Sequence, residues 1–204
     1  MKTEIYLIRH AEPLKSNNIN NSDNLQIQNE KWPLTVSGEK KAKELSEKEE
    51  LQNIDLVISS NYVRTISTAK YIADKNNTNI NIMEDFNERK FGINEWSEKP
   101  ENFEKKQFED ENFKTPNGES RKEVTSRMYE GLINVLNNNQ GKRIVITSHA
   151  TAITFLLMKL CEYKDSTIYF NNKLLIDSSY KWNAPEVFKL TYEDDNLIDI
   201  ENIR

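Results

Sequence analysis

The chain has 204 residues, with 28 Lys and Arg against 33 Asp and Glu, and a formal net charge of -5. This length suits one α/β domain, so we expect residues 1–204 to form a single domain. The mildly acidic balance provides no overall field for nucleic acid or an anionic membrane, so any anionic ligand must bind in a local basic pocket.

The chain also lacks the segments that would direct it to a membrane or an oxidising compartment. No run of 18 apolar residues and no signal-peptide pattern occurs. Cys161 is the single cysteine, which excludes an intrachain disulfide and fits a reducing compartment. We therefore expect a cytoplasmic protein with no membrane or nucleic-acid partner, and the sequence favours neither a monomer nor an oligomer.

The first third of the chain begins with a buried strand and a polar loop. Residues 4–9 are β-branched and aromatic, which predicts a strand, whereas the Asn- and Ser-rich residues 13–33 predict a loop. A helix over 40–51 follows, with Thr35 or Ser37 as its N-cap. The next predicted elements are a buried strand at 55–60, a helix from about 65 to 75, and a strand at 79–83.

The charged and aromatic residues 92–117 interrupt this alternation and predict an insertion with short helices, which we expect to cover the functional site described below. A long helix is expected over 120–139, opened by a capping box of Ser120 and Glu123 and ended by Gly141 as a C-cap. The remaining predicted elements are a buried strand at 143–148, an apolar helix at 150–161, and late strands at 186–192 and 197–200.

Strands that alternate with helices predict a mostly parallel sheet with helices on both faces, a three-layer α/β/α sandwich. Fully apolar strands support this prediction, because parallel strands are buried on both sides.

Three of the predicted strands run directly into reactive side chains. The first ends in Arg9 and His10, the second ends in two serines with Arg64 shortly after, and the third ends at His149. Ligands of open parallel sheets bind beyond the carboxyl ends of the strands. If these three strands are neighbours, one crevice collects two arginines and both histidines of the chain.

This set of side chains suits a phosphoryl group. Each guanidinium grips phosphate oxygens with a rigid fork and stabilises the charge of the transition state. A neutral imidazole can attack phosphorus, provided that its other nitrogen has an acceptor that fixes the tautomer. The second histidine would donate to the transferring group, and the helix N-termini after Arg64 and His149 would add backbone donors.

The leaving alkoxide needs a proton, and Glu88 is the candidate general acid. It follows the strand at 79–83, and burial near a phosphate dianion would raise its pKa so that it holds a proton near neutrality. Glu84, Asp85 and Glu95 lie nearby and are the alternatives for this role.

Six segments resemble motifs of the histidine phosphatase superfamily, also called the phosphoglycerate mutase-like fold, and they occur in the family's order from residue 5 to about 155. The segments are LIRHAEP, PLTVSGEKKA, SSNYVRTISTA, ERKFG, PNGES with Arg127, and IVITSHA.

The resemblance implies that His10 becomes the phosphohistidine, that Arg9, Arg64 and His149 hold the phosphate, and that Glu88 is the proton donor. It also implies that neither metal nor another cofactor is needed. Arg89 corresponds to the arginine that helps hold a substrate carboxylate in phosphoglycerate mutases.

Two further groups are candidates for substrate contact. Ser16 and Asn17 lie in the loop after His10 and could reach the phosphate, although loop polarity alone explains them equally well. The aromatic side chains that could line a cap over the substrate are Trp32, Phe91, Trp96 and Phe103.

We therefore expect a phosphatase that hydrolyses a small phosphorylated metabolite, a phosphomonoester, through a phosphohistidine on His10. One alternative is a cofactor-dependent phosphoglycerate mutase, although the Phe-Thr-Gly-Trp segment of those mutases is absent here. The other alternative is a non-catalytic protein that binds a phosphate ligand on the same fold.

Overall fold

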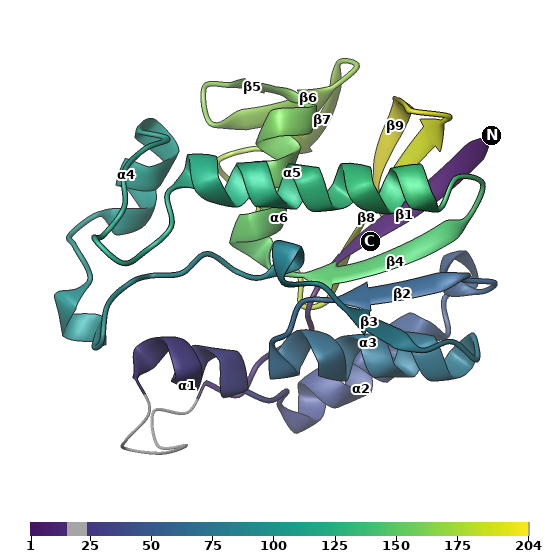
Figure 1. The fold of residues 1–204 in the computed structure, drawn as a ribbon, viewed down its shortest axis with the longest axis horizontal. Helices are drawn as coiled ribbons and strands as arrows, with labels where there is room; N and C mark the ends of the chain where they lie inside the picture. Colours follow the sequence, from purple (N-terminus) through teal and green to yellow (C-terminus); the bar gives the residue numbers. More distant parts are fainter. Residues whose placement is uncertain (16–23, 204) are drawn as a thin grey trace.

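A mixed six-stranded sheet lies at the centre of the computed structural model, which describes residues 1–15 and 24–203 (Figure 1). Its order is β3-β2-β4-β1-β8-β9, with β1 to β4 parallel and with β8 and β9 antiparallel at one edge. The mostly parallel sheet predicted from the sequence is confirmed. The strands are β1 (Lys2–Arg9), β2 (Leu56–Ser59), β3 (Ile80–Ile82), β4 (Arg143–Ser148), β8 (Glu186–Glu193) and β9 (Asn196–Ile203).

Helices cover both faces of this sheet, because alternate side chains of each buried strand point to opposite sides. In β1, Ile5 and Leu7 pack in one core cluster with α5 and α6, whereas Tyr6 and Ile8 pack in a second cluster with α2 and α3. The three-layer arrangement is therefore confirmed (Figure 1). The four helices are α2 (Val36–Ser46), α3 (Val63–Lys75), α5 (Arg121–Asn138) and α6 (Ala150–Leu160).

The capping signals of two helices are confirmed. Thr35 is the N-cap of α2, and its Oγ1 accepts a hydrogen bond of 2.9 Å from the Gly38 amide. The helix therefore begins four residues before the predicted one and gives way to a 3₁₀ turn at Glu49–Leu51. Ser120 and Glu123 form the expected capping box at the start of α5.

Two sequence-based predictions are wrong. Helix α1 (Leu25–Lys31) lies within residues 13–33, which were expected to be a loop; Asn24 caps it, and it buries Leu25 on one face. Gly141 is not the C-cap of α5, because the helix ends at Asn138 with Asn139 as its C-cap. With a φ of 81°, Gly141 instead turns the chain toward β4 and donates to the Thr3 hydroxyl.

A small antiparallel sheet between α6 and β8 was not expected. It consists of β5 (Glu162–Lys164), β6 (Thr167–Phe170) and β7 (Lys173–Ile176). Two-residue turns at 165–166 and 171–172 join the three strands, and all four turn residues have positive φ. That conformation is typical of type I′ hairpin turns, so the Asn171-Asn172 pair is the signal that would have revealed this sheet.

The segment between β3 and α5 contains the short helices that were expected there, a 3₁₀ turn at Trp96–Glu98 and helix α4 (Phe103–Glu109). Figure 1 shows α1 and α4 on the same side of the molecule, beyond one end of the sheet. Within the described residues, no helix is both long and apolar enough to cross a membrane.

The backbone that follows β1 is held tightly between α2 and α3. The Glu12 carbonyl accepts from the Thr35 amide at 3.0 Å, and the Ala11 amide donates to the Thr68 hydroxyl at 3.0 Å. Gly38 makes this approach possible, because a Cβ there would lie 2.3 Å from the Glu12 carbonyl oxygen. The chain just after His10 is therefore fixed by helix packing.

We expect Gly38→Ala to lower the free energy of unfolding by about 1–3 kcal/mol, because the added methyl group must displace the backbone of Glu12. In an exposed helix the same change would raise stability by about 1 kcal/mol. Urea unfolding of this variant measures the sign. Lys40→Ala, at a site in α2 whose side chain is 78% exposed, is the control and should have little effect. A more stable Gly38→Ala protein would contradict the close contact.

Candidate active site

The reactive residues meet at one edge of the sheet because β1, β2 and β4 are parallel neighbours in matching register. Arg9 pairs with Ser148, and Ser59 pairs with Thr147. The His10 amide donates to the Ser148 carbonyl at 3.1 Å, which continues this pairing beyond the strands. The structure therefore brings Arg9, His10, Arg64 and His149 together at this edge.

A cavity of about 340 Å³ opens at this edge. Glu88 lines it together with His10, and the N-terminus of α6 reaches it through Ala150 and Thr151. An excess of positive charge in the lining suits an anionic ligand. The cationic side chains that line it are Arg9, Lys15, Arg64 and Arg89.

The hydrogen bonds of His10 determine which ring nitrogen carries the proton. Nδ1 lies 2.7 Å from the Ala11 carbonyl oxygen, which can only accept, and Nε2 lies 3.0 Å from Nε of Arg64, which can only donate. The proton is therefore on Nδ1, and the lone pair of Nε2 points toward Arg64. Burial and the neighbouring Arg64 charge hold the pKa of His10 well below its usual range, so the ring is neutral at pH 7.

Arg64 lies in the first turn of α3, is 4% exposed, and bridges the two histidines. Its Nη2 lies 3.1 Å from Nδ1 of His149, and its Nη1 donates to the Asn29 carbonyl of α1. Burial lowers the pKa of Arg64 to about 10, so the guanidinium stays charged at neutral pH. The helix that was not expected, α1, thus supplies one of the anchors of a predicted site residue.

His149 lies one layer behind the cavity. It is fully buried and is the N-cap residue of α6. Because its Nδ1 faces a donor of Arg64, the ring proton is on Nε2, which donates to the Ser60 hydroxyl at 2.9 Å. Ser60 donates in turn to the Thr65 hydroxyl at 2.7 Å, since Thr65 itself donates to the Tyr62 carbonyl. Ser60 therefore orients the His149 ring, a role that its position at the end of a strand did not predict.

Arg9 is held by the segment that precedes β8, far along the chain. Its Nη1 donates to the Trp182 carbonyl at 3.0 Å and to the Asn183 carbonyl at 2.7 Å. Glu186 fixes that segment, because it accepts from the Asn183 amide at 2.7 Å and from the Tyr180 hydroxyl. No sequence motif connected Arg9 with these residues.

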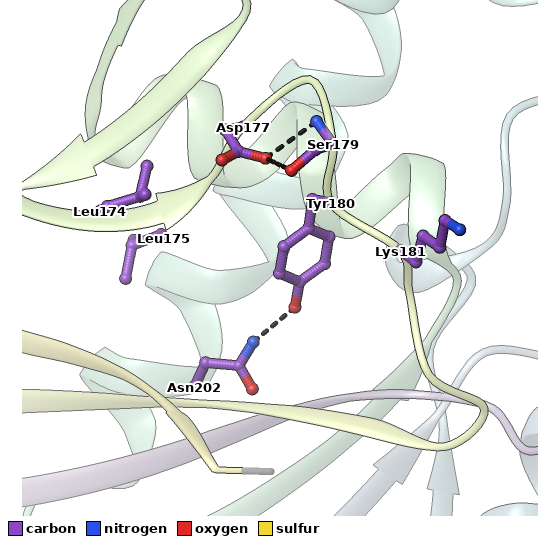
Figure 2. Close-up of a pocket in the computed structure, with 7 residues that line it drawn as sticks. All are labelled: Leu174, Leu175, Asp177, Ser179, Tyr180, Lys181 and Asn202. Atoms are coloured by element: carbon purple, nitrogen blue, oxygen red, sulfur yellow. Dashed lines mark hydrogen bonds between the residues drawn. The ribbon is translucent and has the colours of Figure 1, made fainter.

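A second cavity, of about 480 Å³, is lined by the segment around Tyr180 together with residues of β7 and β9 (Figure 2). Figure 2 shows Asn202 bonded to the Tyr180 hydroxyl, and Asp177 bonded to Ser179, along its wall. Among the described residues, neither histidine and no arginine lines this cavity, so the phosphate-binding groups that line the smaller cavity are not found in it there.

Glu88 and Arg89 both line the smaller cavity. Glu88 is half-buried, whereas Arg89 is only 4% exposed, with its guanidinium over the rings of Phe91 and Phe103 and 3.3 Å from the Glu104 carboxylate. The described residues that line this cavity do not include the alternative carboxylates Glu84, Asp85 and Glu95. Glu88 is therefore the carboxylate best placed to reach a bound ligand.

Aromatic rings form one wall of the cavity. Trp32, which follows α1, stacks on Trp96 with ring centroids 6.5 Å apart, and Phe91 packs edge-on against Trp96 at 5.2 Å. Lys15 lies over the Trp32 ring. Lys15 and Asn29 line the cavity too, and no sequence signal singled them out.

Asn17 and Ser16, the candidates for substrate contact in the loop after His10, lie outside the described residues. In residues 1–15 and 24–203, no three His, Cys, Asp or Glu side chains are grouped in a way that could hold a metal ion.

Sequence comparison relates residues 5–173 to a family model described as the histidine phosphatase superfamily, branch 1. The probable phosphoglycerate mutase GpmB of Salmonella arizonae is 29% identical over 161 residues, which cover 76% of this chain and 73% of that protein. An uncharacterised phosphatase of Bacillus subtilis, PhoE, is 31% identical over 128 residues, or 63% of this chain and 64% of that protein.

Solved structures share the fold. A mycobacterial glucosyl-3-phosphoglycerate phosphatase superposes with a TM-score of 0.72 at 15% identity and covers 99% of this chain and 97% of its own. A mutant phosphoserine phosphatase from Entamoeba histolytica, in complex with phosphoserine, gives a TM-score of 0.71 at 21% identity, over 97% and 96% of the two chains.

We expect the stability of the protein to fall as the pH drops below about 6.5. Burial lowers the pKa of both His10 and His149, so the unfolded chain takes up protons there that the folded chain does not. Each histidine then costs up to about 1.4 kcal/mol of unfolding free energy per pH unit. Urea unfolding between pH 7.5 and 5.5 measures the slope.

His149→Gln should reduce this slope, because the unfolded chain then takes up a proton on His10 but no longer on residue 149. An unfolding free energy that stays constant from pH 6.5 to 5.5 in the unaltered protein would contradict the lowered pKa values.

Proposed function

Because the chain belongs to the histidine phosphatase superfamily, branch 1, we propose that it is a phosphatase that hydrolyses a small phosphomonoester through a phosphohistidine on His10. The observation that carries the proposal is the neutral tautomer of His10, which has its proton on Nδ1. The neutral ring, with Nδ1–H bonded to the Ala11 carbonyl, leaves Nε2 unprotonated at the cavity, where it accepts from Arg64 and becomes free to attack once Arg64 turns to the phosphate. That is the arrangement a nitrogen nucleophile needs.

In the first step, Nε2 of His10 attacks phosphorus as the ester P–O bond breaks. Arg9 and Arg64 bind the non-bridging oxygens and stabilise the charge that spreads over them. The leaving alkoxide takes a proton from Glu88.

In the second step, water attacks the phosphohistidine while the Glu88 carboxylate takes a proton from it. The P–N bond breaks, the electron pair returns to Nε2, and inorganic phosphate leaves.

His149 supports this chemistry from behind the cavity. Its ring, fixed by Ser60, holds Arg64 in place. It becomes a phosphate ligand if Arg64 moves toward the bound group and the ring proton shifts to Nδ1, with Nε2 then accepting from the Ser60 hydroxyl. Asn17 is proposed as a further contact to the ligand, and Arg89 as the ligand of a second anionic group of the substrate.

The second candidate function is a phosphoglycerate mutase. It is favoured by the 29% identity to probable phosphoglycerate mutase GpmB and by the position of Arg89 in the cavity. Isomerisation of phosphoglycerate that depends on added bisphosphoglycerate would support the mutase. Binding of phosphate or vanadate without any turnover would support a non-catalytic binding protein.

His10→Ala should abolish turnover of 4-nitrophenyl phosphate, with a loss of at least about a thousandfold in kcat, because the nucleophile is removed. Phosphate release is measured in the presence of a chelator and without added metal. Lys40→Ala, on the exposed face of α2, is the control and should keep full activity. Near-normal activity of His10→Ala would exclude the proposed intermediate.

Glu88→Gln should slow the hydrolysis of alkyl phosphates by about 10²–10⁴-fold but affect 4-nitrophenyl phosphate far less, because only the poor leaving group needs a proton. The comparison of kcat across a series of esters measures this difference. Glu84→Gln, at an exposed neighbouring carboxylate that does not line the cavity, is the matched control. An equal loss on both kinds of ester would point to a different proton donor.

A further inference from the structure

The segment that carries Glu88 and Arg89 is irregular, yet several of its backbone groups are bonded to side chains from elsewhere in the chain. A 3₁₀ turn at Glu84–Phe86 follows β3, and no helix or strand covers residues 87–93. Such a segment cannot satisfy its own carbonyl groups through a helix or a sheet, so side chains from elsewhere or water must do so. The groups that provide these bonds decide where Glu88 and Arg89 lie.

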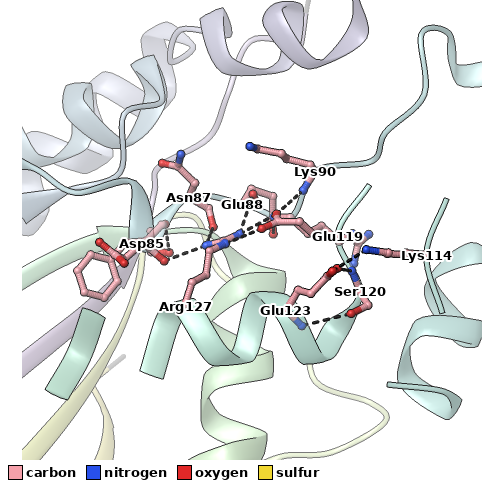
Figure 3. A network of polar contacts seen from close by, with 12 residues as sticks. Asp85, Asn87, Glu88, Lys90, Lys114, Glu119, Ser120, Glu123 and Arg127 are labelled. Atoms are coloured by element: carbon pink, nitrogen blue, oxygen red, sulfur yellow. Dashed lines mark hydrogen bonds and ion pairs between the residues drawn. The ribbon is translucent and has the colours of Figure 1, made fainter. Parts of the chain in front are cut away.

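One side chain of α5, Arg127, binds three of these carbonyl groups. Its Nη1 donates to the Asp85 carbonyl at 2.8 Å and to the Asn87 carbonyl at 2.9 Å, and its Nη2 donates to the Glu88 carbonyl at 3.2 Å. Figure 3 shows the guanidinium pointing into the curve of the segment. Arg127 thus binds Glu88, the proposed proton donor, directly through the backbone carbonyl of Glu88.

Glu119 binds both Arg127 and the same irregular segment. It accepts from Arg127 through both carboxylate oxygens, at 2.7 Å and 3.0 Å, and its Oε2 also accepts from the Lys90 amide at 2.8 Å (Figure 3). The Glu119 amide donates to the Lys90 carbonyl at 2.9 Å. All five N–H donors of Arg127 are therefore used, three on the segment and two on a carboxylate that binds the same segment.

Two other contacts tie this segment to the strands that carry the rest of the site. The Ser148 hydroxyl donates to the Phe86 carbonyl at 2.7 Å, and the Asn61 amide donates to the Asn87 side chain at 3.1 Å. These bonds fix the start of the segment relative to β4 and β2. The bonds of Arg127 and Glu119 then fix the part that reaches the cavity.

We propose that Arg127 and Glu119 are positioning residues that set the location of Glu88 and Arg89 relative to His10. The inference rests on the proposed function of this site. Neither residue lines the cavity, so they act only through the segment 85–90. A displacement of a proton donor by about 1 Å can cost about a hundredfold in rate, which makes such a brace important for the step that needs the proton.

Arg127→Lys tests the proposal because it keeps the charge but loses the five-donor fork. We expect kcat on an alkyl phosphate to fall about 10–100-fold, and kcat on 4-nitrophenyl phosphate to fall less than about threefold. In a Glu88→Gln background the same change should add no further leaving-group-dependent loss. Glu119→Gln should show the same pattern and serves if Arg127→Lys does not fold.

Arg121→Lys is the matched control, since Arg121 is also a half-buried arginine of α5 but binds the Gln107 carbonyl instead. It should leave the leaving-group dependence unchanged. A loss in Arg127→Lys that is equal for both esters, or that adds fully to the effect of Glu88→Gln, would show a purely structural role and overturn the proposal.

Hydrogen exchange provides a readout that does not require activity. Amides of residues 85–90 should exchange faster in Arg127→Lys than in Arg121→Lys, and unchanged exchange would also overturn the proposal. An unaltered protein without turnover would instead reject the proposed function. Turnover with a leaving-group-selective Glu88→Gln, but without that pattern in Arg127→Lys, would reject this inference alone.

Discussion

The buried guanidinium of Arg64 bonds to one ring nitrogen of His10 and one of His149, and the chemistry of the site depends on this arrangement. A guanidinium only donates hydrogen bonds, so each histidine must turn an unprotonated nitrogen toward it. The other ring nitrogens then need acceptors, which are the Ala11 carbonyl and the Ser60 hydroxyl. One charged group thereby sets two tautomers and, by its charge and the shared burial, keeps both rings neutral.

The three layers of the fold each deliver one part of this site. The parallel strands β1, β2 and β4 bring the histidines to one edge, and α3 supplies Arg64. The segment before β8 holds Arg9 through backbone carbonyls, while α5 holds the backbone of Glu88 through Arg127. The charged side chains at the cavity are thus restrained from different sides, which limits how far they must reorganise around an anion.

Much of this could be predicted because it follows from regular patterns. Buried strands with helices between them indicate a parallel sheet, and parallel strands bring Arg9, His10 and His149 to the same edge. Helix α1 and the small sheet were missed because a seven-residue helix and three- to four-residue strands carry little periodicity. The roles of Arg127 and Ser60 depend on backbone carbonyls and hydroxyls at specific distances, which no residue spacing encodes. The functional roles of the site residues stay predictions.

The aromatic wall has a spectroscopic consequence. The chain contains three tryptophans, and two of them, Trp32 and Trp96, line the cavity, whereas the Trp182 ring packs on Tyr180 and Phe188. Indole emission responds to nearby charge and to solvent exposure, and Arg64 lies 5.9 Å from the centroid of the Trp32 ring. Two of the three indole rings therefore lie at the cavity, so a ligand that binds there should change the tryptophan fluorescence of the protein without any attached dye.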